Sequence, residues 1–87
     1  MQGTVREVHW LNPHSWVYLE VLDAEEQPTL WVLEGAAATT LFRKGWTKEM
    51  VEVGDEISVR CHPLKDGSPG CLLGYIASEA GLEKEFD

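Results

Sequence analysis

The stretch HWLNPHSWVYLEVL, residues 9–22, decides the fold, because it ends one strand, turns and begins another. Asn12-Pro13 is a turn signal, since asparagine accepts local backbone hydrogen bonds and proline fixes φ. After the turn, residues 15–22 alternate between two faces, as a half-buried β-strand does. One face carries Val17, Leu19 and Val21, and the other carries Trp16, Tyr18 and Glu20.

Four further segments carry strand patterns on either side of this one. The five strands are expected at residues 3–10, 15–22, 29–34, 56–62 and 71–77. Residues 36–44 predict a short helix that Gly45 ends, and Thr47 can cap a short turn at 48–51. In the first strand, the three-residue spacing of Val5 and Val8 breaks the alternation and predicts a β-bulge at Arg6-Glu7.

This order of elements predicts an all-β fold, a five-stranded OB-fold-like Greek-key barrel with one short helix between the third and fourth strands. In that topology the first strand pairs with the second and fourth, the second pairs with the third, and the third closes onto the fifth. Another small open barrel, of SH3-like type, is the alternative. We expect a single barrel domain over residues 3–78 and an acidic C-terminal tail, residues 79–87, that frays.

The chain is acidic, with 15 Asp and Glu against 7 Lys and Arg among its 87 residues, and its net charge is −8. Nucleic acids and anionic membrane surfaces both attract basic side chains, so neither partner is expected. No apolar run approaches the roughly 18 residues that cross a bilayer, and Met1-Gln2-Gly3 leads into a strand without a signal-peptide pattern. The charge suits a small molecule, a cation or a basic partner, or serves solubility alone.

Aromatic and ionisable side chains converge at one end of the predicted barrel. If a hairpin forms across the loop from Asp23 to Pro28, Tyr18 lies opposite Glu34 and Trp16 approaches Gly35-Ala36. The turn from Asn12 to Ser15 then lies at the same end. The expected ligand-binding residues are His14, Trp16, Tyr18, Glu34 and Trp46. Aromatic walls with a histidine and a carboxylate suit a small apolar or aromatic ligand.

Structural roles for the same residues are the alternative. His14 and Glu34 can satisfy backbone groups at the turn and the helix end, and Glu34 can pair with Arg43. Trp46 can pack the helix onto the barrel, and the outward pair Trp16 and Tyr18 can form a homodimer interface.

Catalysis and metal binding are the two other functional hypotheses. A histidine and a carboxylate can move a proton, so an enzyme would use His14 and Glu34 as its acid–base pair. His9 and His14 flank the turn and, beside tryptophan faces, suit a copper ion. Two histidines make a poor closed site, and Met1 and Met50 lie far from the turn in the sequence. We therefore expect no cofactor, with copper as the alternative.

Cys61 ends the fourth strand and Cys71 begins the fifth, so a hairpin would place them nearly opposite each other. That placement favours a disulfide if their Cα atoms come within about 7 Å. Free buried thiols, or a metal site that adds His62, are the alternatives.

Motifs spread over the chain resemble those of a bacterial family of small exported proteins of unknown function. The first is a G-T-V…W-x-N-P-H stretch, and the second is a later R-x-G-W segment. The matching positions include Gly3-Thr4-Val5, Trp10, Asn12-Pro13-His14, Arg43 and Gly45-Trp46. The resemblance implies an OB-like barrel and a periplasmic location, and it implies no established activity. The chain departs from the pattern in Cys61 and Cys71 and in the alanine run 36–38.

These observations favour a periplasmic domain that binds a small ligand at one end of the barrel. A copper-binding carrier protein and a small acid–base enzyme acting on an apolar substrate are the alternatives. No catalytic signature such as G-x-S-x-G or H-E-x-x-H occurs in the sequence.

Overall fold

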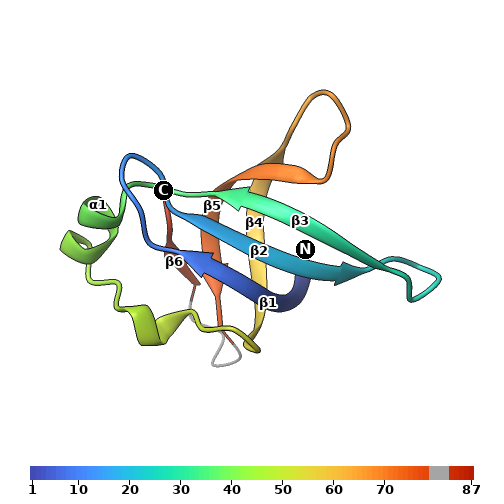
Figure 1. Ribbon diagram of the computed structural model, residues 1–87, viewed down its shortest axis with the longest axis horizontal. Helices are drawn as coiled ribbons and strands as arrows, with labels where there is room; N and C mark the ends of the chain where they lie inside the picture. The colour runs from blue at the N-terminus through green and yellow to red at the C-terminus, as the bar shows by residue number, and fades with distance from the viewer. Residues whose placement is uncertain (79–82) are drawn as a thin grey trace.

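The computed structural model describes residues 1–78 and 83–87, which form a β-barrel with one short α-helix (Figure 1). The strands are β1 (Gln2–His9), β2 (Trp16–Leu22), β3 (Pro28–Glu34), β4 (Glu56–Pro63), β5 (Gly70–Ala77) and β6 (Glu83–Glu85). The helix α1 (Ala38–Arg43) and the 3₁₀ turn η1 (Lys48–Met50) lie between β3 and β4. The five predicted strands are all present, each with its ends within a residue of the prediction.

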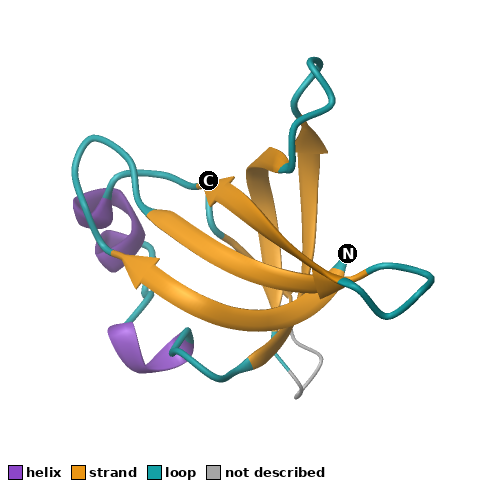
Figure 2. Ribbon diagram, turned by 45° about the vertical axis from the view of Figure 1, so that its right-hand side comes forward, coloured by secondary structure: helices purple, strands orange, loops and turns teal. Residues whose placement is uncertain are grey.

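The strands close into a barrel with the Greek-key order of an OB-fold. β1 pairs with β2 and β4, β2 pairs with β3, and β4 pairs with β5, all antiparallel. A parallel pairing of β3 with β5 closes the barrel, so the predicted fold class is confirmed. In both views α1 and η1 lie on one side of the barrel, and the β2–β3 and β4–β5 loops project on the other (Figures 1 and 2).

A β-bulge lies at Arg6, as the spacing of Val5 and Val8 predicts. Val5 pairs with Leu19 and Glu7 with Tyr18, so one residue of β1 has no partner on β2. A bulge bends its strand and increases the local twist. β1 pairs with β2 on both sides of the bulge, from Thr4 to His9, and its first residues, Gln2 to Thr4, also pair with β4 along the other edge.

The inward faces of the strands fill the core. Buried strand residues are Val5, Val17, Leu19, Leu33, Ile57, Val59, Cys71, Leu73 and Ile76. Leu41 of α1, Trp46, Val51 and Phe86 complete the same cluster. Burial of these apolar side chains is the main stabilising contribution to a domain of this size.

The helix α1 begins two residues later than predicted, at Ala38, because the preceding backbone is held in extended pairing. The Ala36 N–H donates to Phe86 O (3.1 Å), and the Ser15 N–H donates to Ala36 O (2.9 Å).

The cap of α1 comes from another segment, since Asn12 Oδ1 accepts from the Thr39 N–H at 3.2 Å. Gly45, at φ 99°, follows the helix end as expected. No helix of the described residues is long and apolar enough to cross a membrane.

The C-terminal segment is part of the barrel, contrary to the expectation that it frays. β6 pairs with β5, and the Phe86 side chain is fully buried. The Trp46 Nε1–H donates to Glu85 O at 2.7 Å, and Lys44 Nζ contacts Glu85 Oε1 at 2.6 Å. The prediction of a frayed tail is wrong for residues 83–87, because Phe86, which stands among acidic residues, anchors the segment in the core. The other residues of the predicted tail, 79–82, lie outside the described chain.

Candidate functional site

The turn after β1 and the end of β3 bring His14 and Glu34 together, as the sequence predicted. His14 Nδ1 lies 3.2 Å from Glu34 Oε2. Backbone hydrogen bonds fix the two segments, since the Gly35 N–H donates to Ser15 O at 2.8 Å. Both side chains remain partly exposed, at 53% for His14 and 29% for Glu34.

The register of β2 and β3 differs from the prediction by two residues. Glu34 pairs with Trp16 rather than with Tyr18, and Tyr18 pairs with Val32. The cause is a tight turn after Leu22, in which Asp23 Oδ1 accepts from the N–H groups of Glu25 and Gln27. This turn makes Leu22 and Pro28 the last pair and thereby sets the register of the whole hairpin.

An open groove of about 350 Å³ begins at Trp16 and Glu34 and runs over the outer face of β3. The start of β5 and the β4–β5 loop (residues 64–69) form its other wall. Its lining residues are Trp16, Leu30, Val32, Glu34, Leu64, Ser68, Pro69, Gly70, Cys71 and Leu72. Most of these side chains are apolar, and Glu34 is the one that carries a charge.

Three leucines of the groove are left in contact with solvent. Leu30, Leu64 and Leu72 are 47%, 42% and 49% exposed. They come from β3, the β4–β5 loop and β5, so only the folded barrel gathers them on one surface. Isolated exposed leucines are ordinary, whereas these three form an exposed apolar patch around one concavity.

The β4–β5 loop is shaped by Asp66 and by a close approach at Gly70. Asp66 Oδ1 accepts from the Ser68 hydroxyl (2.6 Å) and from the Ser68 N–H (2.9 Å). These hydrogen bonds to the Ser68 side chain and backbone lower the pKa of the Asp66 carboxyl below its usual value. A Cβ on Gly70 would lie 3.3 Å from Val32 O of β3 and 2.9 Å from the end of the exposed Leu64 side chain, so the glycine leaves room where the loop meets β3.

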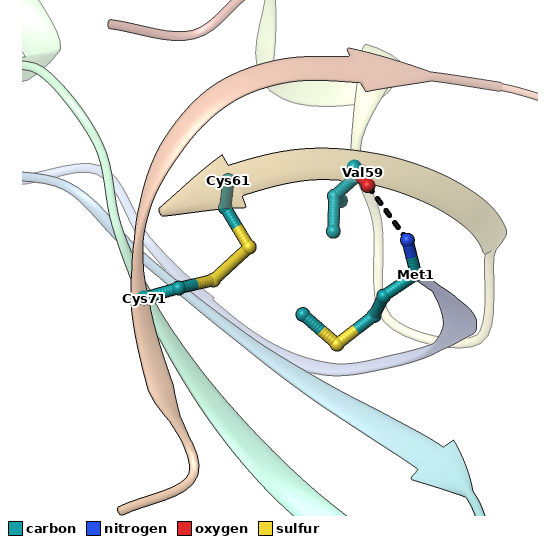
Figure 3. Close-up of a disulfide and its surroundings, with 4 residues drawn as sticks. All are labelled: Met1, Val59, Cys61 and Cys71. Carbon is teal, nitrogen blue, oxygen red and sulfur yellow. Dashed lines mark hydrogen bonds between the residues drawn. A yellow bond between two sulfur atoms is a disulfide. The ribbon is translucent and has the colours of Figure 1, made fainter. Parts of the chain in front are cut away.

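The predicted disulfide between Cys61 and Cys71 is present beside this wall (Figure 3). Cys61 pairs with Leu73, and Cys71 pairs with Pro63, so the bridge runs diagonally between β4 and β5. The Cα atoms are 5.8 Å apart, within the ordinary range for a disulfide. Cys71 also pairs with Leu33 of β3, so the bridge is attached to the pairing that closes the barrel.

Tyr18 and His9 lie against each other and outside the groove. Their rings meet edge to face, with centroids 5.6 Å apart. His9 Nε2 also lies 3.8 Å from Glu7 Oε1. Tyr18 is thus on the same sheet face as Trp16 but does not line the groove.

Trp46 lies in the core rather than in the groove. Its side chain is 5% exposed and packs edge to face against Phe86, with ring centroids 5.0 Å apart. Of the residues expected to bind a ligand, the structure therefore brings together Trp16, Glu34 and the neighbouring His14. It places Trp46 in the structural role that the sequence left as an alternative.

Copper binding at His9 and His14 stays a prediction. Each histidine contacts a different glutamate, Glu7 and Glu34 respectively. Within residues 1–78 and 83–87, no group of three or more His, Cys, Asp or Glu side chains is arranged to hold a metal ion.

The second wall of the groove consists of residues that were not predicted to bind a ligand. Leu72 lies between Cys71 and Leu73, both buried, so strand alternation could have marked it as outward-facing. Leu64, Ser68 and Pro69 belong to an irregular loop, and no sequence pattern indicates that it folds back over β3.

The fold and the groove define a small closed β-barrel with an open, largely apolar groove over the β3–β5 pairing. Residues 1–73 match the model of DUF6152, a family of unknown function, and the chain belongs to that family. Comparisons with curated proteins and with solved structures give no match.

Proposed function

We propose that this protein is a periplasmic binding module for a small apolar or aromatic ligand, seated in the groove between Trp16 and the β4–β5 loop. The observation that carries the proposal is the meeting of Leu30, Leu64 and Leu72 around one concavity. Burying these side chains against a ligand is favourable, at about 25 cal/mol per Å² of apolar surface.

The size and composition of the groove support a small-molecule ligand. Its volume of about 350 Å³ lies near the lower end of the usual range for such sites, roughly 300–1,000 Å³. Trp16 provides a flat aromatic surface beside the apolar wall, while Glu34 and Ser68 provide polar groups at separate places. Small-molecule sites commonly combine an apolar lining with a few polar groups of this kind.

The disulfide supports the proposed location. Disulfides persist in oxidising compartments such as the periplasm and are rare in the bacterial cytoplasm. Cys61 and Cys71 are bonded, and the structure has no free cysteine among its described residues.

The proposal is tested with 1-naphthylmethanol, a neutral aromatic probe, added to the ¹⁵N-labelled protein and followed by NMR. We expect saturable shifts at the backbone amides of Val32, Leu64 and Leu72. Trp16→Ala should weaken binding by about tenfold, since loss of an aromatic contact costs about 1–2 kcal/mol. Leu22→Ala is the matched control, because Leu22 is 59% exposed and lies outside the groove.

Two outcomes would contradict the proposal. The first is the absence of saturable binding, or shifts scattered over the whole surface. The second is a change in the chemical shifts of the groove amides as the protein concentration rises without probe, together with a doubled mass by sedimentation. That result would make the groove a homodimer interface instead.

A further inference from the structure

We infer that the ligand of this groove is an organic cation, an amine carried on an apolar or aromatic body. The inference rests on the proposed function and adds the charge of the ligand. It follows from three features of the site: the single charged side chain in its lining, the aromatic ring beside that side chain, and the charge of the whole barrel.

Glu34 is the charged group of the groove. Among the residues that line it, all within the described chain, none is basic. The Glu34 side chain is 29% exposed, and His14 Nδ1 approaches one of its oxygens, Oε2. A carboxylate accepts several hydrogen bonds, so Oε1 is left to receive a donor from a ligand. A charged N–H donor makes a stronger bond there than a hydroxyl does.

Trp16 lies next to Glu34 on the outer face of the sheet. The two residues are register partners on β2 and β3, and both line the groove. Side chains of directly opposed residues in an antiparallel pair lie about 5 Å apart at Cβ. An ammonium bound to Glu34 would therefore lie within reach of the indole face, which attracts cations electrostatically. The same indole offers an apolar surface to the ligand's body.

The charge of the chain favours the same ligand. The net charge is −8, and three of the seven Lys and Arg side chains, Arg6, Lys44 and Arg60, are each in an ion pair with a glutamate outside the groove. The β4–β5 loop adds one charge of each sign, Lys65 and Asp66, neither of which lines the groove. A field of this sign concentrates cations near the surface and repels anions.

The test compares three probes with one aromatic body: 1-naphthylmethylamine, which is protonated at neutral pH, neutral 1-naphthylmethanol and anionic 1-naphthoate. Dissociation constants are measured by NMR titration at a fixed ionic strength. We expect the amine to bind about tenfold more tightly than the alcohol, the gain typical of a charged hydrogen bond, and the carboxylate to bind most weakly.

Glu34→Gln should abolish the difference in affinity between the amine and the alcohol, because the amide removes the negative charge with which the ammonium pairs. Glu25→Gln changes the net charge equally but lies in the β2–β3 turn, outside the groove, so it should preserve the difference. Thermal unfolding of each variant checks that the fold is retained.

The outcomes separate this inference from the proposed function. If the alcohol binds at the groove but the amine binds no more tightly, the ligand-binding function stands and the cationic ligand is wrong. A preference for the amine that survives Glu34→Gln overturns the inference that Glu34 binds the ammonium, because the preference then arises from the net charge of the protein alone. If none of the three probes binds at the groove, both proposals fail.

Discussion

Gly35 shows how closely the C-terminal segment packs against the barrel. A Cβ at this position would lie 2.4 and 2.6 Å from two ring carbons of Phe86 and 2.8 Å from its carbonyl oxygen. Phe86 in turn contacts Trp46 and Trp10, with ring centroids 5.0 and 5.7 Å apart. The absence of a side chain at residue 35 is therefore what lets Phe86 complete the core.

Gly35→Ala should destabilise the protein by about 1–3 kcal/mol, the usual cost of overpacking a core. The penalty should shrink when Phe86→Leu removes the ring that the new methyl group meets. Urea unfolding of both single variants and the double variant gives the coupling between the two sites. Strictly additive penalties would mean that the two residues do not compete for the same space.

Individual side-chain roles were the least predictable from the sequence. His14 and Glu34 could be paired because they flank strand ends that the pattern located well. Phe86 could not be recognised as a core residue, since it stands in the acidic sequence EKEFD. Trp46 packs against that same phenylalanine, a contact that no pattern in the sequence indicates.

At the scale of elements, the N-P-H turn stabilises α1 across the chain. The first residue before the helix, Ala37, has no side-chain cap of its own. Asn12 supplies the missing acceptor, since its Oδ1 receives the Thr39 N–H at 3.2 Å and the Thr39 hydroxyl at 3.3 Å. The turn that precedes the candidate site thus also anchors the helix on that side of the barrel.

Asn12→Ala should cost about 1 kcal/mol of stability, as removal of an N-cap does. Asn12→Asp should retain most of it, because the carboxylate keeps the acceptor and also suits the positive end of the helix dipole. Chemical denaturation of the two variants measures the difference. Equal losses would indicate that Asn12 acts through the shape of the turn and not through its hydrogen bond to Thr39.

The strands were predictable because a half-buried strand alternates its apolar residues, and the bulge was predictable because it breaks that alternation. The helix start was not, because its cap comes from Asn12, a residue distant in sequence. The hairpin register was missed by two residues, since it depends on the Asp23 hydrogen bonds that close the turn. Local pattern thus predicts the elements, and contacts between segments determine their ends and registers.

At the scale of the whole molecule, the barrel closes through a short seam between β3 and β5. Its pairs are Val32–Gly70, Leu33–Cys71 and Glu34–Leu72, and the Val32 N–H donates to Pro69 O at 3.0 Å. The disulfide from Cys71 to Cys61 fixes one side of this seam to β4. The groove lies over the same seam, so closure of the barrel and formation of the groove depend on the same contacts.

Reduction of the disulfide should lower the stability by about 2–3 kcal/mol, the loop-entropy contribution of a bridge that closes ten residues. Hydrogen exchange of the Val32 amide should accelerate more than that of amides between β1 and β2. The Cys61→Ser, Cys71→Ser double variant should show the same pattern of amide exchange, and added reductant should not change its stability. Uniform acceleration across the barrel would show that the bridge stabilises the whole fold without a specific effect on the seam.

The architecture as a whole followed from strand order, because five strands with a helix after the third fit few closed topologies. The groove could not be predicted from the strand order, although one of its two walls could. Trp16 and Glu34 could be assigned to the outer face of a hairpin from alternation alone. The opposing wall needs the β4–β5 loop to lie close to β3, and the hydrogen bond from the Val32 N–H to Pro69 O that holds it there joins segments far apart in the sequence.

The position of Phe86 also bears on how the chain is made. Its ring packs against Trp10, so contacts that complete the core join nearly opposite ends of the sequence. During synthesis from the N-terminus, the barrel cannot finish its interior until residue 86 has left the ribosome. Long-range contacts of this kind slow folding. The interior of this barrel therefore closes late in synthesis, after β1 to β5 have already been made.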